Sequence, residues 1–479
     1  MKCRLTLVMA LGLAAAASAA PSGEKYSFTF RLGGCTDTVL YLAQHYRDGY
    51  QWIDSARVVD GWCEFRGRHD FSRGIYALVH QDRKKLATDF CIDDSRQFSI
   101  NGDAGLSPES ITVKGSRVNE QMYAYIATIN AAKKEMNDIR ERKKATATQA
   151  QAEVDEKALM ERMERYEADI KANASGNIFF ELQQMCEAPE PPEEEADKAT
   201  WYRLHYWDNL LPTHFGQDNG MRQTLLHSPQ FFGKMNYYFF GILYYAYSEL
   251  VAQGIDNFVA VAEGDTMLMR YVFDFIEPRY FRSTTNIGWD AVWCHLVEQY
   301  YSQGRCPWVS EGTRINMQKK YERISQSIIG ARGKELCMLD TTQIESPEHW
   351  VCSHHLPQKY VVLWFWDPDC HHCQEQSAAL KVLYDSLLTA PYRPLEVYAV
   401  GYENDLAKWK RYIREHDFRW INVGGPNVNI DYQEAYNVHG APTMIILNER
   451  REIIMNKPIP AKELLPFIAD YEKKQSAQR

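Results

Sequence analysis

The 479-residue sequence predicts a multidomain protein with an all-β, sandwich-like N-terminal domain, a central α-helical region and a C-terminal α/β domain. Three observations predict this order. Apolar residues alternate with period two near the start of the chain, recur at helical spacing from Val118 onward, and give way from about residue 339 to alternating strand-like and helix-like segments. A chain of this length is too long for a single hydrophobic core, so several domains are expected.

The chain opens with the pattern of a secretory signal peptide over residues 1–19. Lys2 and Arg4 supply the positive charges, residues 5–16 form a short apolar run, and residues 17–19 form a small-residue cleavage site. The apolar run is shorter than the roughly 20 residues that cross a bilayer. We therefore expect an exported protein without a transmembrane segment after cleavage. The periplasm is the expected location, with secretion or outer-membrane association as alternatives.

Charge and cysteine content narrow the class of protein further. The net charge of −9 is modest, and the one basic cluster, residues 140–144, is interrupted by Glu141, so no nucleic-acid partner is expected. Loss of Cys3 with the signal peptide leaves ten of the eleven cysteines. In an oxidising compartment some of these could form disulfides, but their spacing alone does not say which.

Residues 24–116 form the predicted β domain, to which no function is assigned. Asp60 and Gly61 stand between two extended runs, a strong signal for a β-hairpin. The region holds no cluster of catalytic residue types. One face of its first extended segment is apolar and consists of Tyr26, Phe28, Phe30 and Leu32.

The apolar period becomes helical in the next part of the chain. Residues 117–186 predict a helical hairpin, because two helical segments flank a polar stretch. Prolines and carboxylates mark residues 187–198 as an acidic, proline-rich linker. Residues 199–335 are rich in aromatic side chains at helical spacing and predict a helical domain of unknown function.

Residues 339–479 predict the C-terminal α/β domain. Residues 359–366 are almost continuously apolar, as expected of a central strand buried on both faces. A helix follows directly, and a second buried strand is expected at residues 395–402. Asn404 is expected to cap the next helix, and two strands and a closing helix complete the predicted domain.

Cys370 and Cys373 lie where the first turn of the helix after the central strand is expected. A thiol there is close to unpaired backbone N–H groups and to the positive end of the helix dipole, so the thiolate is favoured. We predict that Cys370 is the nucleophile and that Cys373 resolves the mixed disulfide. Asp369 is expected to oppose the thiolate, and a charged His371 or His372 to favour it, so these three residues are predicted to tune the redox chemistry.

Two motifs carry a resemblance to the thioredoxin fold. The segment "FWDPDCHHC" resembles the aromatic strand end and redox pair of thioredoxin-like proteins, and "VHGAPT", about 70 residues later, resembles their cis-proline loop. The element order of residues 339–479 is similar as well. The resemblance implies that Pro442 is cis and that the backbone of Ala441 contacts the substrate.

A closer resemblance is to exported thioredoxin-like proteins of the Bacteroidota, in which a β domain and a helical region precede a domain with "DPDCHHC". It covers nearly the full chain, and its signature in the β domain is weak. It implies a thiol–disulfide oxidoreductase acting in cell redox homeostasis. Its partners would be protein thiol or disulfide substrates and an upstream redox protein, and no cofactor is expected.

The sequence departs from its relatives at two positions. Trp364 stands six residues before the first cysteine, where thioredoxins keep a buried acid for proton transfer. Relatives that act in cytochrome maturation often have a glutamate three residues after the second cysteine. Here that residue is Gln376, with Glu375 one position earlier.

Two other functions remain open from the residues alone. The Cys-His-His-Cys segment 370–373 could join Cys352, His354 and His355 in a zinc or copper site. Against this, adjacent histidines on a helix point to different sides, and metal binding leaves the "VHGAPT" motif unexplained. The domain could also be a redox-inactive binding module.

Overall fold

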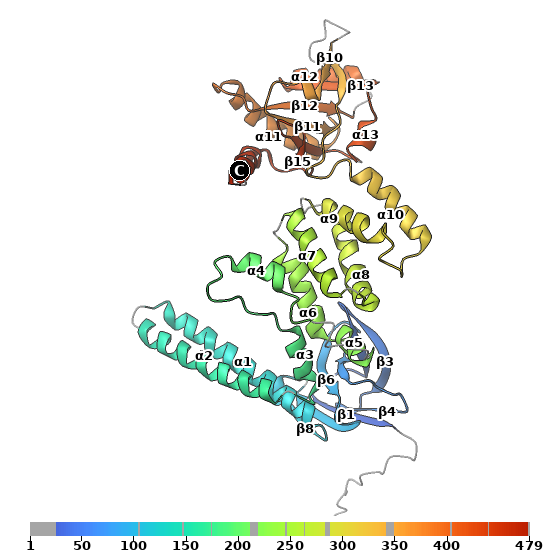
Figure 1. The fold of residues 1–479 in the computed structure, drawn as a ribbon, viewed down its shortest axis with the longest axis vertical. Helices are drawn as coiled ribbons and strands as arrows, with labels where there is room; N and C mark the ends of the chain where they lie inside the picture. The colour runs from blue at the N-terminus through green and yellow to red at the C-terminus, as the bar shows by residue number, and fades with distance from the viewer. Residues whose placement is uncertain are drawn as a thin grey trace, which may run out of the picture. The chain divides into compact units, whose positions relative to one another are not determined.

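The computed structural model describes residues 25–477 except 104–105, 146–147, 174, 211–218, 245–246, 263, 283–287, 342–348, 403–404 and 439. The predicted signal peptide therefore lies outside the described residues. The chain forms two compact units (Figure 1). The first extends to Pro192 and includes His205–Tyr237, and the second consists of Glu193–Leu204 and the chain from Tyr238 onward. No described helix combines the length and apolar character needed to cross a membrane.

The first unit begins with two four-stranded sheets, which confirms the predicted β fold at the N-terminus. Phe28 and Phe98 of one sheet lie against Phe90 of the other, with ring centroids 6.0 and 5.8 Å apart. The inner faces of the two sheets thus share an aromatic core. One sheet has the order β4-β1-β7-β8, and the other has the order β3-β2-β5-β6. The strands are β1 (Tyr26–Gly33), β2 (Val39–Tyr46), β3 (Gly49–Arg57), β4 (Trp62–Gly67), β5 (Gly74–Val79), β6 (Leu86–Ile92), β7 (Gln97–Asp103) and β8 (Thr112–Lys114).

The two-residue turn at Asp60 and Gly61 forms as predicted, and Val59 and Trp62 exchange both backbone hydrogen bonds over 2.9 Å, but the strands beyond this pair do not continue the hairpin. Both residues have positive φ, and Val59 forms an isolated bridge with Trp62. The strands on either side belong to different sheets. A Cβ on Gly61 would lie 2.3 Å from the carbonyl oxygen of Leu32, so the packing against β1 requires glycine here. The turn therefore carries the chain from one sheet to the other.

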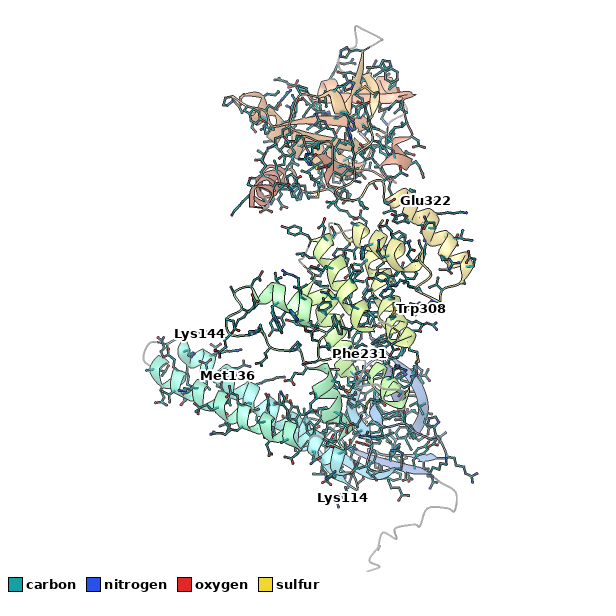
Figure 2. The ribbon with its side chains drawn as sticks, viewed as in Figure 1. Lys114, Met136, Lys144, Phe231, Trp308 and Glu322 are labelled. Atoms are coloured by element: carbon teal, nitrogen blue, oxygen red, sulfur yellow. A yellow bond between two sulfur atoms is a disulfide. The ribbon has the colours of Figure 1, made fainter. Side chains whose placement is uncertain are left out.

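Helices α1 (Arg117–Lys143) and α2 (Gln149–Ala172) pack against each other along the predicted apolar faces. Ile139, Leu159 and Met163 contribute to their shared core, together with Met136, which is labelled in Figure 2. The shorter helices of this unit are α3 (Ile178–Cys186), α5 (Asn219–Leu226) and α6 (Pro229–Tyr237).

The second unit contains the remaining helices of the central region. They are α4 (Lys198–His205), α7 (Ser248–Ala262), α8 (Thr266–Arg282), α9 (Trp289–Leu296) and α10 (Glu311–Ile324), with π-helical turns η3 (Tyr238–Ile242) and η4 (Val297–Tyr301). Large aromatic side chains fill their core, as the spacing predicts. Tyr280, for example, is fully buried and lies against Trp289 with ring centroids 5.0 Å apart.

The C-terminal domain is built on a seven-stranded mixed sheet with the order β10-β9-β13-β12-β11-β14-β15. Strand β11 (Tyr360–Trp366) is central and every residue of it is buried, which confirms the prediction. Its neighbours are β12 (Leu395–Gly401), which is parallel to it, and β14 (Thr443–Leu447), which is antiparallel. The outer strands are β9 (Cys337–Asp340), β10 (Trp350–Cys352), β13 (Ile421–Val428) and β15 (Ile453–Met455).

Strands β9, β10 and β13 were not predicted from the sequence. β10 has only three residues, and β13 contains Gly424, Gly425 and Pro426, which disfavour a regular strand. The register between β9 and β13 shifts within this segment. Short length and the irregular register explain why the alternation of apolar residues does not reveal these strands.

Helices cover both faces of this sheet. Helices α11 (His371–Leu388), α12 (Leu406–Glu415) and α14 (Ala461–Ala477) pack on the face that presents Trp364 and Trp366. Helix α13 (Tyr432–Ala435) packs on the face that presents Phe365. The side chain of Asp405 caps helix α12. Asn404, the expected cap, lies outside the described residues. These helices bury both sides of β11 and leave its carboxyl end, where the cysteine pair follows, at the edge of the core.

Candidate functional site

Cys370 is the N-cap residue of α11, directly after the loop that leaves β11. Its sulfur accepts a hydrogen bond from the backbone N–H of Cys373 over 3.4 Å. Its own N–H donates to the carbonyl oxygen of Asp367 over 3.1 Å, which closes the turn. The thiol is half-buried, so it remains accessible from solvent. A backbone N–H directed at the sulfur stabilises a thiolate, as expected at the start of a helix.

Cys373 lies one turn further along α11 and is fully buried in the core. Burial raises the pKa of its thiol to about 12, and the neighbouring Cys370 sulfur contributes to the same direction. Burial raises the pKa of the Tyr412 hydroxyl on α12, and the nearby Cys373 contributes to the same direction. The two cysteines thus differ in exposure in the way that the sequence predicts.

The loop before β14 approaches the cysteine pair. The Ala441–Pro442 peptide bond is cis, which confirms the prediction. The Cys370 sulfur lies 3.7 Å from the carbonyl oxygen of Ala441, 71 residues away along the chain. Pro442 and Ala441 are half-buried, so the loop borders the exposed side of the sulfur.

His371 and His372 occupy the first turn of α11 and point into solvent, with 78% and 81% of their side chains exposed. Both rings approach the carboxylate of Glu375, at 3.3 and 3.5 Å. The Glu375 carboxylate therefore lies near both histidines that follow the nucleophile. The sequence alone gave Glu375 no role, although its spacing of three and four residues from the histidines on a helix is the available signal.

Asp369 forms an ion pair with Lys408 of α12. Its backbone N–H also donates to the side chain of Asp367 over 2.8 Å. The lysine partner was missed from the sequence because it lies on another helix, and no local spacing indicates the contact.

Trp364 is fully buried, and its indole N–H donates to the hydroxyl oxygen of Ser377 over 3.0 Å. Ser377 is also fully buried, on the inner side of α11. This hydrogen bond joins the indole of Trp364 to the hydroxyl of Ser377, and neither group is ionised near neutral pH. The buried proton acceptor that thioredoxins carry here is thus replaced by a structural hydrogen bond.

The histidines and cysteines of the alternative metal site are divided between two places. Cys352 is bonded to Cys337 across β9 and β10, where the two residues are in register. Within the described ranges, the one group of three or more potential ligand side chains with donor atoms within 4.8 Å of one another consists of Glu335, Cys337 and Cys352. His371 and His372, as described above, instead approach Glu375.

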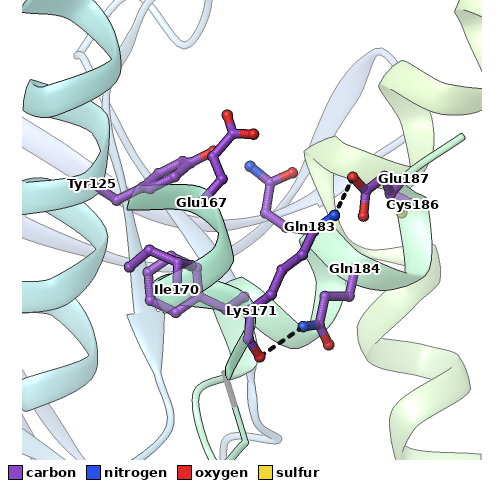
Figure 3. Close-up of a pocket in the computed structure, with 9 residues that line it drawn as sticks. Tyr125, Glu167, Ile170, Lys171, Gln183, Gln184, Cys186 and Glu187 are labelled. Carbon is purple, nitrogen blue, oxygen red and sulfur yellow. Dashed lines mark hydrogen bonds and ion pairs between the residues drawn. The ribbon is translucent and has the colours of Figure 1, made fainter. Parts of the chain in front are cut away.

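The first unit contains a separate pocket of about 180 Å³ between α1, α2 and α3 (Figure 3). Lys171 reaches across its mouth to Glu187, at 2.8 Å. Burial raises the pKa of Cys186, which lines the pocket, to about 12, so its thiol is poorly suited to redox chemistry. The pocket is smaller than the roughly 300–1,000 Å³ typical of small-molecule sites, and we assign no ligand to it.

Comparison with known proteins agrees with this geometry. A family model described as thioredoxin-like matches residues 358–453, which include both cysteines and the cis-proline loop. This segment is a thioredoxin-like domain. The match covers the central part of the C-terminal sheet and leaves β9, β10 and α14 outside. No curated protein matches the chain.

Solved structures of bacterial proteins are also similar to the chain. A thioredoxin-like protein from Bacteroides caccae is 16% identical, covers 59% of this chain and 98% of its own, and has a TM-score of 0.43. A domain of a possible thiol-disulfide isomerase from Cytophaga hutchinsonii is 28% identical, covers 31% of this chain and 97% of its own, and has a TM-score of 0.28. The thioredoxin domain of a thiol-disulfide oxidoreductase from Bacteroides vulgatus is 19% identical, covers 30% of this chain and 96% of its own, and has a TM-score of 0.26.

Proposed function

We propose that the protein is an exported thiol–disulfide oxidoreductase that uses Cys370 and Cys373 to exchange disulfides with protein substrates. The observation that carries the proposal is the environment of the Cys370 sulfur. It is half-buried at the start of α11, accepts a backbone N–H, and lies 3.7 Å from the carbonyl oxygen of Ala441. This combination supports a thiolate nucleophile beside a strip of backbone that a substrate strand can join.

In the reducing direction, the Cys370 thiolate attacks one sulfur of a substrate disulfide. A bond forms between Cys370 and that sulfur, and the other substrate sulfur leaves as a thiolate that takes a proton. Cys373 then loses its proton and attacks the Cys370 sulfur, which releases the second substrate thiol. The substrate gains two electrons and two protons, and the enzyme pair becomes a disulfide. The oxidising direction is the reverse of these steps.

The raised pKa of Cys373 determines which of the two cysteines attacks the substrate first. Burial keeps Cys373 protonated while Cys370 reacts, so the attacking thiol is Cys370. The second step requires Cys373 to lose that proton, and Trp364 and Ser377 are engaged with each other. We infer that solvent reaching the site in the mixed disulfide accepts the proton directly.

The test is a trapped-substrate experiment in the native host with the full chain. Cys373→Ser leaves Cys370 free to attack but removes the resolving thiol, so mixed disulfides with protein partners should accumulate and disappear on reduction. Cys370→Ser is the matched control, because it removes a sulfur from the same turn but should trap nothing. Purified protein should also catalyse insulin reduction in the presence of a dithiol. Equal trapping by both variants, or no insulin activity in the unmodified protein, would contradict the proposal.

Export is the second part of the proposal and rests on residues 1–19. Cleavage after Ala19 would release a chain beginning at Ala20, in a compartment that permits disulfides. N-terminal sequencing of protein from the native host checks this directly. A chain that still begins at Met1 would refute export by this route.

A further inference from the structure

The disulfide between Cys337 and Cys352 joins the short edge strand β10 of the C-terminal sheet to its neighbour β9. It is distinct from the Cys370–Cys373 pair, and the proposed exchange reaction does not use it. Both cysteines are half-exposed, so a reductant can reach them. The thiols that would form on reduction are held facing each other by the β9–β10 pairing, in which Cys352 is directly opposite Cys337.

Two further ligand types stand at this disulfide. One carboxylate oxygen of Glu335 lies within 4.8 Å of both sulfur atoms. The same carboxylate approaches Nε2 of His355, at 3.3 Å. Glu335 and Cys337 come from the chain entering β9, and Cys352 and His355 come from the chain leaving β10. The sheet pairing thus brings two sulfurs and one carboxylate oxygen together, and the imidazole of His355 lies beside that carboxylate.

We propose that reduction of the Cys337–Cys352 disulfide creates a zinc site made of these two thiolates, Glu335 and His355. Zinc takes four ligands of these types in a tetrahedron, with bonds of about 2.0–2.3 Å, so neighbouring donor atoms are about 3.3–3.8 Å apart. The 3.3 Å separation of the Glu335 and His355 donor atoms already matches one edge of such a tetrahedron. The His355 side chain is 76% exposed and can swing toward the sulfurs without displacing the core.

The disulfide makes this site conditional on redox state. A dithiol donor passes two electrons and two protons to the disulfide, which becomes two thiols while the donor becomes a disulfide. Zinc then displaces the two thiol protons and binds both sulfurs. In the oxidised protein the sulfur atoms are bonded to each other and are not available as thiolate ligands. Zinc binding therefore marks the reduced state of this disulfide. It also stabilises the two thiolates against reoxidation.

The set of four donor atoms favours zinc over copper(I). Two thiolates with an imidazole and a carboxylate form a mixed donor set that suits zinc, whereas copper(I) is favoured by soft thiolate and thioether donors and gains little from a carboxylate. The two strands also limit how far the sulfurs can separate after reduction, because β9 pairs on its other side with β13. This pre-arrangement lowers the entropy lost when the metal binds.

The experiment uses the full chain carrying Cys370→Ser and Cys373→Ser, so that the redox pair contributes no thiol. The protein is reduced with a phosphine, freed of reductant without oxygen, and titrated with zinc against a chromophoric chelator. We expect one zinc per reduced chain and none in the oxidised chain. Cobalt should give thiolate-to-metal charge-transfer absorption in the reduced chain alone.

Variants test whether zinc is bound by the four proposed ligands or by other side chains. Glu335→Gln and His355→Asn should each weaken zinc binding at least about tenfold, because each removes a ligand. His354→Asn is the matched control and should leave binding unchanged, since His354 is not in the proposed set. Cys337→Ser with Cys352→Ser should abolish binding. The proposal is overturned if the Glu335, His355 or double cysteine variants bind zinc as tightly as the parent chain, or if the oxidised chain binds it as well. It is also overturned if reduction unfolds the domain as judged by near-ultraviolet circular dichroism.

Discussion

Lys408 forms an ion pair with Asp369, the residue directly before the nucleophile Cys370, although 39 residues separate the pair along the chain. The lysine side chain is 33% exposed and the aspartate side chain is 66% exposed, so solvent screens the contact in part. The pair still places a cation beside the carboxylate that the sequence predicts to oppose the Cys370 thiolate. Helix α12 thereby adjusts the charge at the cysteine pair.

Replacing Lys408 with Met should make Cys370 less reactive near neutral pH. The Asp369 charge would then act on the sulfur without its partner. Iodoacetamide should label Cys370 more slowly at pH 7, by no more than about fivefold, since an exposed ion pair contributes under about 1 kcal/mol. Lys410→Met removes the same charge from the same helix and is the control. The double variant Asp369→Asn with Lys408→Met should restore the original rate, and a persistent slowing there would count against the ion pair.

Iodoacetamide should modify Cys370 well before Cys373. Cys370 is half-buried, whereas Cys373 is fully buried with a pKa raised to about 12. The thiolate is the reactive form, so Cys373 should react slowly at any pH below that value. Mass spectrometry of briefly labelled, reduced protein measures the two rates. Faster labelling of Cys373 would reverse the assigned roles.

The reduction potential of the pair should lie above that of thioredoxin, nearer about −200 mV than about −270 mV. A histidine before the second cysteine stabilises the reduced thiolate, and His372 holds this place. His372→Pro should make the pair more reducing, and proline is tolerated there because it falls in the first turn of α11. Equilibration with glutathione decides this, and an unchanged or higher potential in His372→Pro would contradict it.

Lys234 should make a contribution to the stability of the first unit that rises with pH between about 8 and 10.5. Burial lowers the pKa of this lysine from 10.5 to about 8, although its ammonium donates to the carbonyl oxygen of Tyr206 over 2.8 Å. In this window the folded chain has released the proton and the unfolded chain still binds it. The native state therefore gains up to about 1.4 kcal/mol per pH unit relative to the unfolded state.

Comparison with Lys234→Met isolates this contribution. Methionine does not titrate, so denaturant midpoints should show the unmodified protein gaining on the variant as pH rises from 8 toward 10.5. Below pH 8 the difference between them should be constant. Lys133→Met, on the exposed side of α1, is the control and should show no such trend. A difference in denaturant midpoint that does not change with pH would show that Lys234 does not contribute to the pH dependence of stability.

The sequence by itself determined the features that local pattern encodes. The continuous apolar run of β11 identifies a strand buried on both faces, because polar residues would be expected on a face open to solvent. The position of the cysteine pair at the start of a helix is also encoded locally, because a helical pattern begins directly after this strand. The "VHGAPT" motif identified the cis-proline loop, and its position next to Cys370 followed from resemblance to a known fold.

Only the tertiary structure decided which distant residues meet. The Cys337–Cys352 bond depends on two strands too short to show a period, and the Lys408–Asp369 pair depends on how α12 packs beside α11. The strands flanking Asp60 and Gly61 likewise join different sheets, although the turn residues are those of a hairpin. Periodicity reports which face of an element is buried, whereas partners are selected by sheet order and packing across the whole chain.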